Sequence, residues 1–144
     1  MSHDKGTLLL SLKPRFAALI LDGQKTVELR RVAPTIQTGD LALIYASSPL
    51  RQLVGTCRVV DVDIASKAEV WERYSDQCAL TEEEYEAYFE GAKHAVAIVV
   101  DSPSRLLEPP SLATLRSRMS GFSPPQSFRY LSMGMLEQLE LNTV

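Results

Sequence analysis

The stretch GQKTVELRR, at residues 23–31, indicates both the fold of this chain and the place of its chemistry. Apolar and polar side chains alternate over residues 26–31, which predicts a short strand. Strand alternation puts Glu28 and Arg30 on one face, while Lys25 stands at the entry to the strand. Charge this dense costs folding free energy unless it is solvated or paired. The stretch is therefore either a solvated edge strand or part of a site.

The flanking sequence predicts short strands alternating with helices. Strands are predicted at residues 7–12, 26–31, 41–45, 52–64 and 95–100. Helices are predicted between Pro14 and Gly23, and at residues 66–75, 82–90 and 111–119. Gly55 is expected to mark a bulge, residues 122–126 a loop, and the segment from residue 128 stays unassigned. These elements predict an α+β fold, a small β-barrel of about five or six strands with inserted helices.

The composition is that of an ordinary globular domain, with 144 residues of which 45% are hydrophobic and 23% charged. This length suits a single domain over residues 1–144, with its core at about residues 7–131. No apolar run approaches the ~18 residues that read as a membrane span. Residues 1–6 do not resemble a signal peptide, so we expect a cytoplasmic protein with no membrane partner.

The cysteine and histidine content argues against a metal site. Cys57 and Cys78 are too few for a disulfide framework and are expected to be reduced thiols. These cysteines, His3 and His94 show no ligand spacing, so we expect neither a metal nor a cofactor.

The net charge of −3 hides a segregation along the chain. Residues 1–66 carry eight basic and six acidic side chains, net +2, and residues 102–144 carry four and three, net +1. Residues 67–101 carry three and nine, net −6. A positive surface built from the two flanking segments therefore remains open, and with it an anionic partner.

Lys25, Glu28 and Arg30 form the first candidate motif. A cation beside a carboxylate fixes its direction and favours its charged form. Such a group can bind an exocyclic amine or move a proton. The ordinary structural alternative is a salt-bridge ladder on the surface of an edge strand, and the sequence leaves both open.

Two further motifs follow. At residues 45–49, YASSP offers Tyr45 for stacking on a base and Ser47 and Ser48 for hydrogen bonds, although a simple strand end with a Ser/Pro turn also explains it. At residues 124–130, PPQSFRY interleaves aromatic and basic residues with an amide.

In that last motif, Gln126 can donate and accept hydrogen bonds, and Arg129 could meet phosphate. Phe128 and Tyr130 could stack on bases. The alternative is a clamp that packs these rings into the core, and at least one ring is expected to pack there.

The three motifs, in this order, resemble the ASCH family, a branch of the PUA-like β-barrels. The matching sequences are SLKP at residues 11–14, GQKTVELRR at 23–31, GD at 39–40, YASSP at 45–49, Gly55 and PQSFRYL at 125–131. The resemblance covers about residues 8–131. It implies a closed or nearly closed barrel beside a cleft that binds RNA or modified nucleosides, with Lys25 as the most characteristic cleft residue.

The resemblance also implies that some members are enzymes. One branch hydrolyses the acetyl amide of acetylated cytidine with the motif lysine, a threonine three residues later and a separate glutamate. Here Lys25 matches the lysine, and Glu28 occupies the threonine position. Other members are linked to RNA cleavage, and the VELRR form is closer to those longer members.

The favoured hypothesis is RNA or nucleotide binding in a basic cleft beside the barrel. The candidate binding residues are Lys13, Lys25, Arg30, Tyr45, Ser47, Ser48, Gln126, Ser127, Phe128, Arg129 and Tyr130. The alternative is an enzyme in the same cleft, either a ribonuclease acting on single-stranded RNA or a nucleoside amidohydrolase. Its candidate catalytic residues are Lys25, Glu28, Tyr45 and Ser47. A second alternative is a protein-interaction module that uses the acidic segment 67–101.

Overall fold

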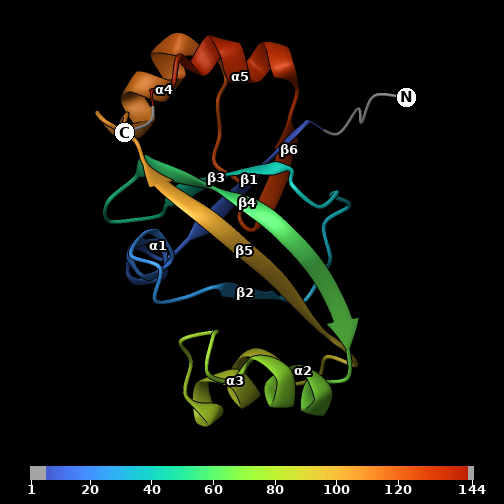
Figure 1. The fold of residues 1–144 in the computed structure, drawn as a ribbon. Coiled ribbons are helices and arrows are strands. Elements are labelled where there is room, and N and C mark those ends of the chain that lie inside the picture. The colour runs from blue at the N-terminus through green and yellow to red at the C-terminus, as the bar shows by residue number, and fades with distance from the viewer. Residues whose placement is uncertain (1–5, 143–144) are drawn as a thin grey trace.

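A computed structural model describes residues 6–142, so His3 and most of the segment 1–6 lie outside the described residues. One six-stranded sheet, in the order β2-β5-β4-β3-β1-β6, curls into a half-barrel (Figure 1). Its strands are β1 (Thr7–Leu12), β2 (Val27–Arg30), β3 (Leu41–Ala46), β4 (Gln52–Ala65), β5 (Ala95–Arg105) and β6 (Phe128–Leu131). The pair β1–β3 is parallel, and the other neighbours are antiparallel.

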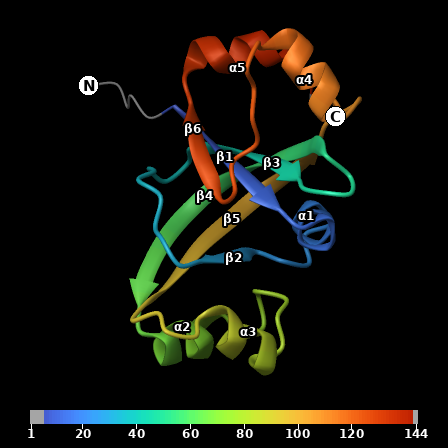
Figure 2. The same ribbon diagram turned by 180° about the vertical axis from the view of Figure 1, so that it is seen from behind.

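Helices lie at both ends of this sheet. They are α1 (Pro14–Leu21), α2 (Lys67–Tyr74), α3 (Glu82–Tyr88), α4 (Leu112–Arg118) and α5 (Met133–Leu139). Seen from behind, α2 and α3 lie below β2, at the opposite end from α4 and α5 (Figure 2). The predicted α+β class is confirmed, and β2 and β6 remain the two unpaired edges of the half-barrel. No helix within residues 6–142 is long and apolar enough to cross a membrane.

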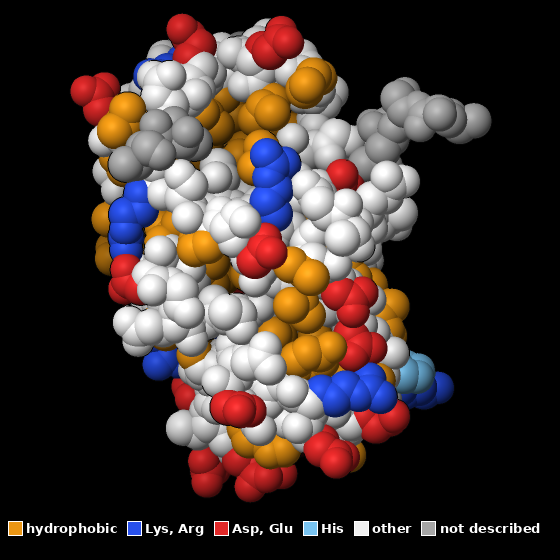
Figure 3. All heavy atoms as spheres, viewed as in Figure 1, with side chains coloured by type: hydrophobic (Ala, Val, Ile, Leu, Met, Phe, Trp, Pro, Cys, Tyr) orange, Lys and Arg blue, Asp and Glu red, His pale blue; other side chains and the backbone are white. Residues whose placement is uncertain are grey.

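The two helices of the acidic segment form as the sequence predicts. The hydroxyl groups of Ser66 and Thr81 accept hydrogen bonds from the backbone amides of Glu69 and Glu84, and each glutamate side chain accepts from the amide of its cap. Two capping boxes thus fix where α2 and α3 begin. Acidic side chains gather at this end of the molecule (Figure 3).

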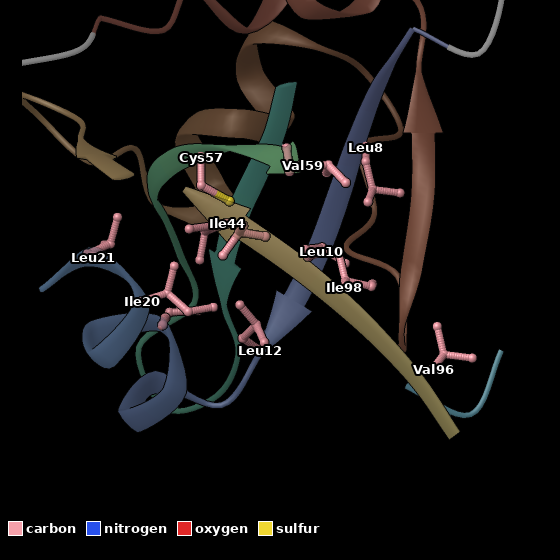
Figure 4. Packing of buried hydrophobic residues seen from close by; sticks show 14 residues of the cluster. Leu8, Leu10, Leu12, Ile20, Leu21, Ile44, Cys57, Val59, Val96 and Ile98 are labelled. Atoms are coloured by element: carbon pink, nitrogen blue, oxygen red, sulfur yellow. The ribbon is translucent and has the colours of Figure 1, made fainter. Parts of the chain in front are cut away.

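The core is split by the sheet into layers. On the inner face of the curl, Ile98 of β5 meets Leu10 and Leu12 of β1 and Ile20 of α1 (Figure 4). Leu9 points to the opposite face, toward the cluster under α4 and α5. A strand that is covered on both sides has no need of polar alternation, which explains the unbroken leucine run of β1.

Gly55 lies at an irregularity in β4, as predicted. The register between β3 and β4 shifts there, since Ile44 pairs with Gly55 but Tyr45 pairs with Leu53. A Cβ on Gly55 would stand 2.6 Å from the carbonyl oxygen of Ser104 and 2.5 Å from a methyl group of Leu21. Only glycine therefore lets α1 pack this closely against the sheet.

Two regions differ from the sequence-based prediction. Strand β5 runs five residues further than residue 100, to Arg105, because its end pairs with Gly55 and Thr56 of the bulged β4. The unassigned C-terminal segment forms β6 and α5, and Leu139 of α5 is fully buried. Strand β6 pairs with β1, more than a hundred residues away in sequence, so no local pattern announces it.

Candidate functional site

A cleft of about 410 Å³ lies where the two edges of the half-barrel face each other. The end of β1 and the start of α1 form one wall, and β2 and α3 form the other. Its lining includes Lys13, Arg15, Phe16, Lys25, Glu28, Arg30, Leu80, Glu84, Tyr88, Gln126 and Ser127. This volume suits one small ligand or a single nucleotide rather than an extended strand.

Three charged side chains are buried in this cleft. Lys25 is 2% exposed, and Glu28 and Arg30 are each 7% exposed. The Lys25 ammonium lies 3.4 Å from Oε1 of Glu28, while Nη2 and Nε of Arg30 lie 2.8 and 3.0 Å from Oε2. The alternative of a solvated surface ladder is therefore wrong, and we call these three residues the buried charge cluster.

Arg30 also connects the two edges of the sheet. Its Nη1 donates to Oγ of Ser127 at 2.9 Å and to the Ser127 carbonyl at 3.3 Å, and Nη2 donates to the carbonyl of Ser11 at 2.9 Å. With the two contacts to Glu28, each of the three guanidinium nitrogens has a protein partner. Arg30 thus links β2 to the end of β1 and to the residue before β6, where no strand pairing closes the barrel.

Lys25 is the most deeply buried residue of the cluster. Its ammonium donates to the backbone carbonyl of Cys78 and lies 4.9 Å from the centroid of the Phe16 ring. Burial lowers the pKa of Lys25, and Arg30 adds to this, whereas Glu28 opposes it. A lysine with a lowered pKa gives up its proton more readily than an exposed one, as proton transfer at neutral pH requires.

With this geometry established, the comparisons identify the family. The sequence matches the ASCH domain over residues 10–104, two thirds of the chain. The chain belongs to the ASCH domain family. This confirms the resemblance carried by the ordered motifs, and the buried charge cluster lies in its GQKTVELRR motif.

Known ASCH proteins resemble this chain along nearly all its length. It is 32% identical over 128 residues to the "ASCH domain-containing ribonuclease" of Zymomonas mobilis, covering 89% of this chain and 86% of that protein. The crystal structure of ASCH from Zymomonas mobilis superposes with a TM-score of 0.89 at 31% identity, covering 95% of each chain. A large ribosomal subunit protein uL22 from Ureaplasma parvum is 29% identical over 126 residues, but this chain spans only 39% of its length.

The ASCH cleft brings together residues from two of the three predicted motifs. Lys13, Gln126 and Ser127 line it together with the buried charge cluster. Lys13 and Gln126 are exposed at the surface, so their polar groups remain accessible. A single hollow therefore collects five of the candidate binding residues from three separate segments of the chain.

The YASSP motif does not contribute to this cleft. Tyr45 is 2% exposed and packs with Leu43 and Leu115 on the face covered by α4 and α5, and burial raises the pKa of its phenol. Ser47 donates its backbone N–H to the carbonyl of Leu12, so the corner adjoins the end of β1. Neither Ser47 nor Ser48 lines the cleft, which corrects the expectation that these residues assist there.

The aromatic residues of β6 also lie elsewhere. Phe128 and Tyr130 are both half-buried against the inner core, with ring centroids 6.0 Å apart, and the Tyr130 hydroxyl accepts from the Thr35 amide at 2.6 Å. Arg129, between them, points to the other face of the strand and does not line the cleft. Both rings pack against the inner core, as the clamp alternative expected, and neither lines the cleft.

The cleft also contains charged and aromatic side chains that were not among the predicted site residues. Arg15 and Phe16 open α1, and Glu84 and Tyr88 lie one turn apart on α3. Arg15 and Phe16 directly follow the SLKP motif, which is a signal that could have found them. No sequence signal marked Glu84 and Tyr88 as cleft residues, because the acidic face of an amphipathic helix is expected to be solvated whether or not it borders a cleft.

Proposed function

We propose that this ASCH domain binds single-stranded RNA or nucleotides in the cleft that contains Lys25. The observation that carries the proposal is a buried lysine, glutamate and arginine in a hollow the size of one nucleotide. Burying charge is costly, and an apolar core of similar shape would be at least as stable. The cluster is therefore better explained by a ligand than by folding alone.

The lining also supports this ligand class. Phe16, Leu29 and Tyr88 offer apolar surface to a base, while Gln126 offers both a donor and an acceptor to its edge. The relative from Zymomonas mobilis carries the name ribonuclease, which associates this family with RNA.

The test is binding of a short, labelled single-stranded RNA, followed by fluorescence anisotropy. Lys25→Met should weaken binding about tenfold, the usual loss for one charge-assisted contact. Lys67→Met is the matched control, because Lys67 is a half-buried lysine on α2 whose ammonium also donates to a backbone carbonyl, that of Phe89 at 3.2 Å. Affinity should also fall steeply with salt, since phosphate contacts release counterions.

Equal affinities of wild type, Lys25→Met and Lys67→Met would overturn the proposal. So would RNA affinity that is absent at low salt or insensitive to salt.

A second candidate function is RNA cleavage, favoured by the ribonuclease name of a relative that this chain matches over most of its length. In this mechanism Glu28 accepts the proton of the 2′-hydroxyl as its oxygen attacks the adjacent phosphorus, and Lys25 stabilises the negative charge that develops on the phosphate. The P–O5′ bond breaks to leave a 2′,3′-cyclic phosphate, and the leaving 5′-oxygen takes a proton from the Lys25 ammonium. The amidohydrolase alternative uses the same two groups on an acetyl amide. Tyr45 and Ser47 do not line the cleft, so this mechanism assigns them no step.

Turnover assays with short RNA and with acetylcytidine test this second function. Lys25→Met and Glu28→Gln should both abolish turnover of the true substrate, whereas Lys67→Met should not. Equal rates in all four proteins would exclude catalysis at this site.

We also propose that the protein works in the cytoplasm. Cys57 and Cys78 are free and buried, and burial raises the pKa of the Cys57 thiol to about 12. Unpaired thiols are typical of a reducing compartment.

A further inference from the structure

We propose that the mouth of the cleft is a phosphate subsite formed by Lys13 and Arg15. Without a bound phosphate Arg15 pairs with Glu84, and a phosphate that binds displaces this carboxylate. This inference rests on the proposed function and specifies its ligand class: a nucleotide that carries a phosphate, with its base inside and the phosphate at the mouth.

The two cations inside the cleft, Lys25 and Arg30, already have protein partners. Each guanidinium nitrogen of Arg30 has a protein partner, and Lys25 is held by Glu28 and by the Cys78 carbonyl. A phosphate placed among them would also meet the Glu28 carboxylate, which repels it. For a bound nucleotide the inner cleft therefore suits the uncharged base better than the phosphate. The cleavage mechanism, which requires a phosphate beside Lys25, is a separate binding mode.

The cations at the mouth of the cleft, in contrast, are exposed to solvent. Lys13 is exposed and forms no ion pair with any residue of the described part of the chain. Arg15 is also exposed, and its guanidinium lies 4.4 Å from the centroid of the Phe16 ring, which holds the planar group at the edge of the cleft. A guanidinium in this position can bind two phosphate oxygens at once.

Glu84 makes the mouth responsive to an anion. Its Oε1 accepts the Thr81 amide at 3.0 Å in the capping box, which leaves Oε2 directed at Arg15, 2.7 Å away. This ion pair spans the cleft from α1 to α3, and 59% and 41% of the two side chains are exposed. Exposed pairs of this kind are weak, so a phosphate can replace the carboxylate on Arg15 at little cost.

The chain offers a closely matched control for Glu84. Glu69 occupies the same capping-box position on α2, and it also forms an exposed ion pair with an arginine, Arg73, at 3.2 Å. Glutamine can replace glutamate in a capping box, so Glu84→Gln and Glu69→Gln both retain the helix cap and lose the charge. Only Glu84 lines the cleft.

The experiment measures binding of adenosine, uridine, their 5′-monophosphates and inorganic phosphate by calorimetry. The monophosphates should bind more tightly than the nucleosides and than inorganic phosphate. Glu84→Gln should tighten monophosphate binding about threefold without changing nucleoside binding, and Glu69→Gln should change neither. Arg15→Gln should weaken monophosphate binding about tenfold and leave nucleoside binding intact.

The subsite is overturned if Glu84→Gln and Glu69→Gln behave alike, or if Arg15→Gln weakens nucleosides and monophosphates equally. It is also overturned if inorganic phosphate binds as tightly as the monophosphates. In each case, nucleoside binding that depends on Lys25 would leave the proposed function standing. If no compound binds in a manner that depends on Lys25, both the subsite and the nucleotide-binding function fail.

Discussion

Two groups of ion pairs in this ASCH domain use the same chemistry in opposite surroundings. In the cleft, Arg30 lies 2.8 Å from Glu28, and these side chains are 8% and 9% exposed. Beside α2, Arg73 lies 3.0 Å from Asp63, with 45% and 22% of the side chains exposed. Nearly equal distances therefore correspond to very different energies, because water screens one pair and not the other.

The pKa shifts follow the same division. Burial is the largest influence on Lys25 and lowers its pKa. For Asp63 the largest influence is a partner, the Tyr74 hydroxyl, which donates at 2.7 Å and lowers the pKa of the carboxyl. At Lys25 burial acts against the charged form, whereas at Asp63 the hydrogen-bonding partner supports it. Only the buried group therefore needs a complete set of protein partners, because water can serve the exposed one.

The largest expected effect is on stability. Arg30→Met leaves the Glu28 carboxylate with Lys25 alone and removes the link between the sheet edges, so the free energy of unfolding should fall by about 3–5 kcal/mol. Urea denaturation measures it, with Arg73→Met as the control, which should cost far less because its ion pair is exposed to water. Similar losses in the two variants would show that burial does not separate the two groups.

A somewhat smaller loss is expected for Glu28→Gln. It leaves Lys25 and Arg30 close together without an opposite charge, although the glutamine oxygen can still accept a hydrogen bond, and about 2–3 kcal/mol of stability should be lost. Glu69→Gln, at an exposed ion pair, should change the unfolding free energy much less than Glu28→Gln does. Equal unfolding midpoints for the two variants would contradict the comparison.

Lys25→Met should leave stability nearly unchanged at neutral pH, because Arg30 still pairs with Glu28 and a buried charge is removed. The pH dependence gives a sharper readout. The pKa of Lys25 is lowered in the folded protein from the ordinary value of 10.5, so between these two pKa values the unfolded chain binds more protons than the folded one. The stability of wild type relative to Lys25→Met should therefore rise with pH toward 10.5.

Subtracting the stability of Lys25→Met from that of wild type cancels the contributions of the tyrosines, whose effect on stability with rising pH has the opposite sign. Burial raises the pKa of Tyr74 and of Tyr85 to about 12, so each loses stabilisation as the pH rises above its ordinary value of 10.0. A wild-type-minus-variant curve that stays flat up to pH 10.5 would refute the assigned pKa direction for Lys25.

Only a small effect is expected at Asp63, which belongs to the exposed pair. Its lowered folded pKa means that it stabilises the fold above its ordinary pKa of 3.8, and that this contribution disappears as the pH falls through the folded value. Asp63→Asn should therefore cost about 0.5–1 kcal/mol at neutral pH and nothing in strong acid. Chemical denaturation at both pH values checks this, and a cost that persists in acid would point to packing rather than charge.

Much of the local structure could be predicted from the sequence. The capping boxes at Ser66 and Thr81, the bulge at Gly55 and the shared face of Glu28 and Arg30 all depend on residues a few positions apart. Capping and strand alternation are set by backbone geometry over one turn or one pleat, so they are readable in a linear pattern.

The sequence by itself determined which side chains could act together on β2, and the order of motifs that marks an ASCH domain. Only the tertiary structure decided that these charges are buried, that Tyr45 belongs to the other face, and that Arg15 meets Glu84 from 69 positions away. The physical reason is that burial and contact across a cleft depend on which elements cover each face of the sheet. Non-local packing settles that, and no spacing within one segment can encode it.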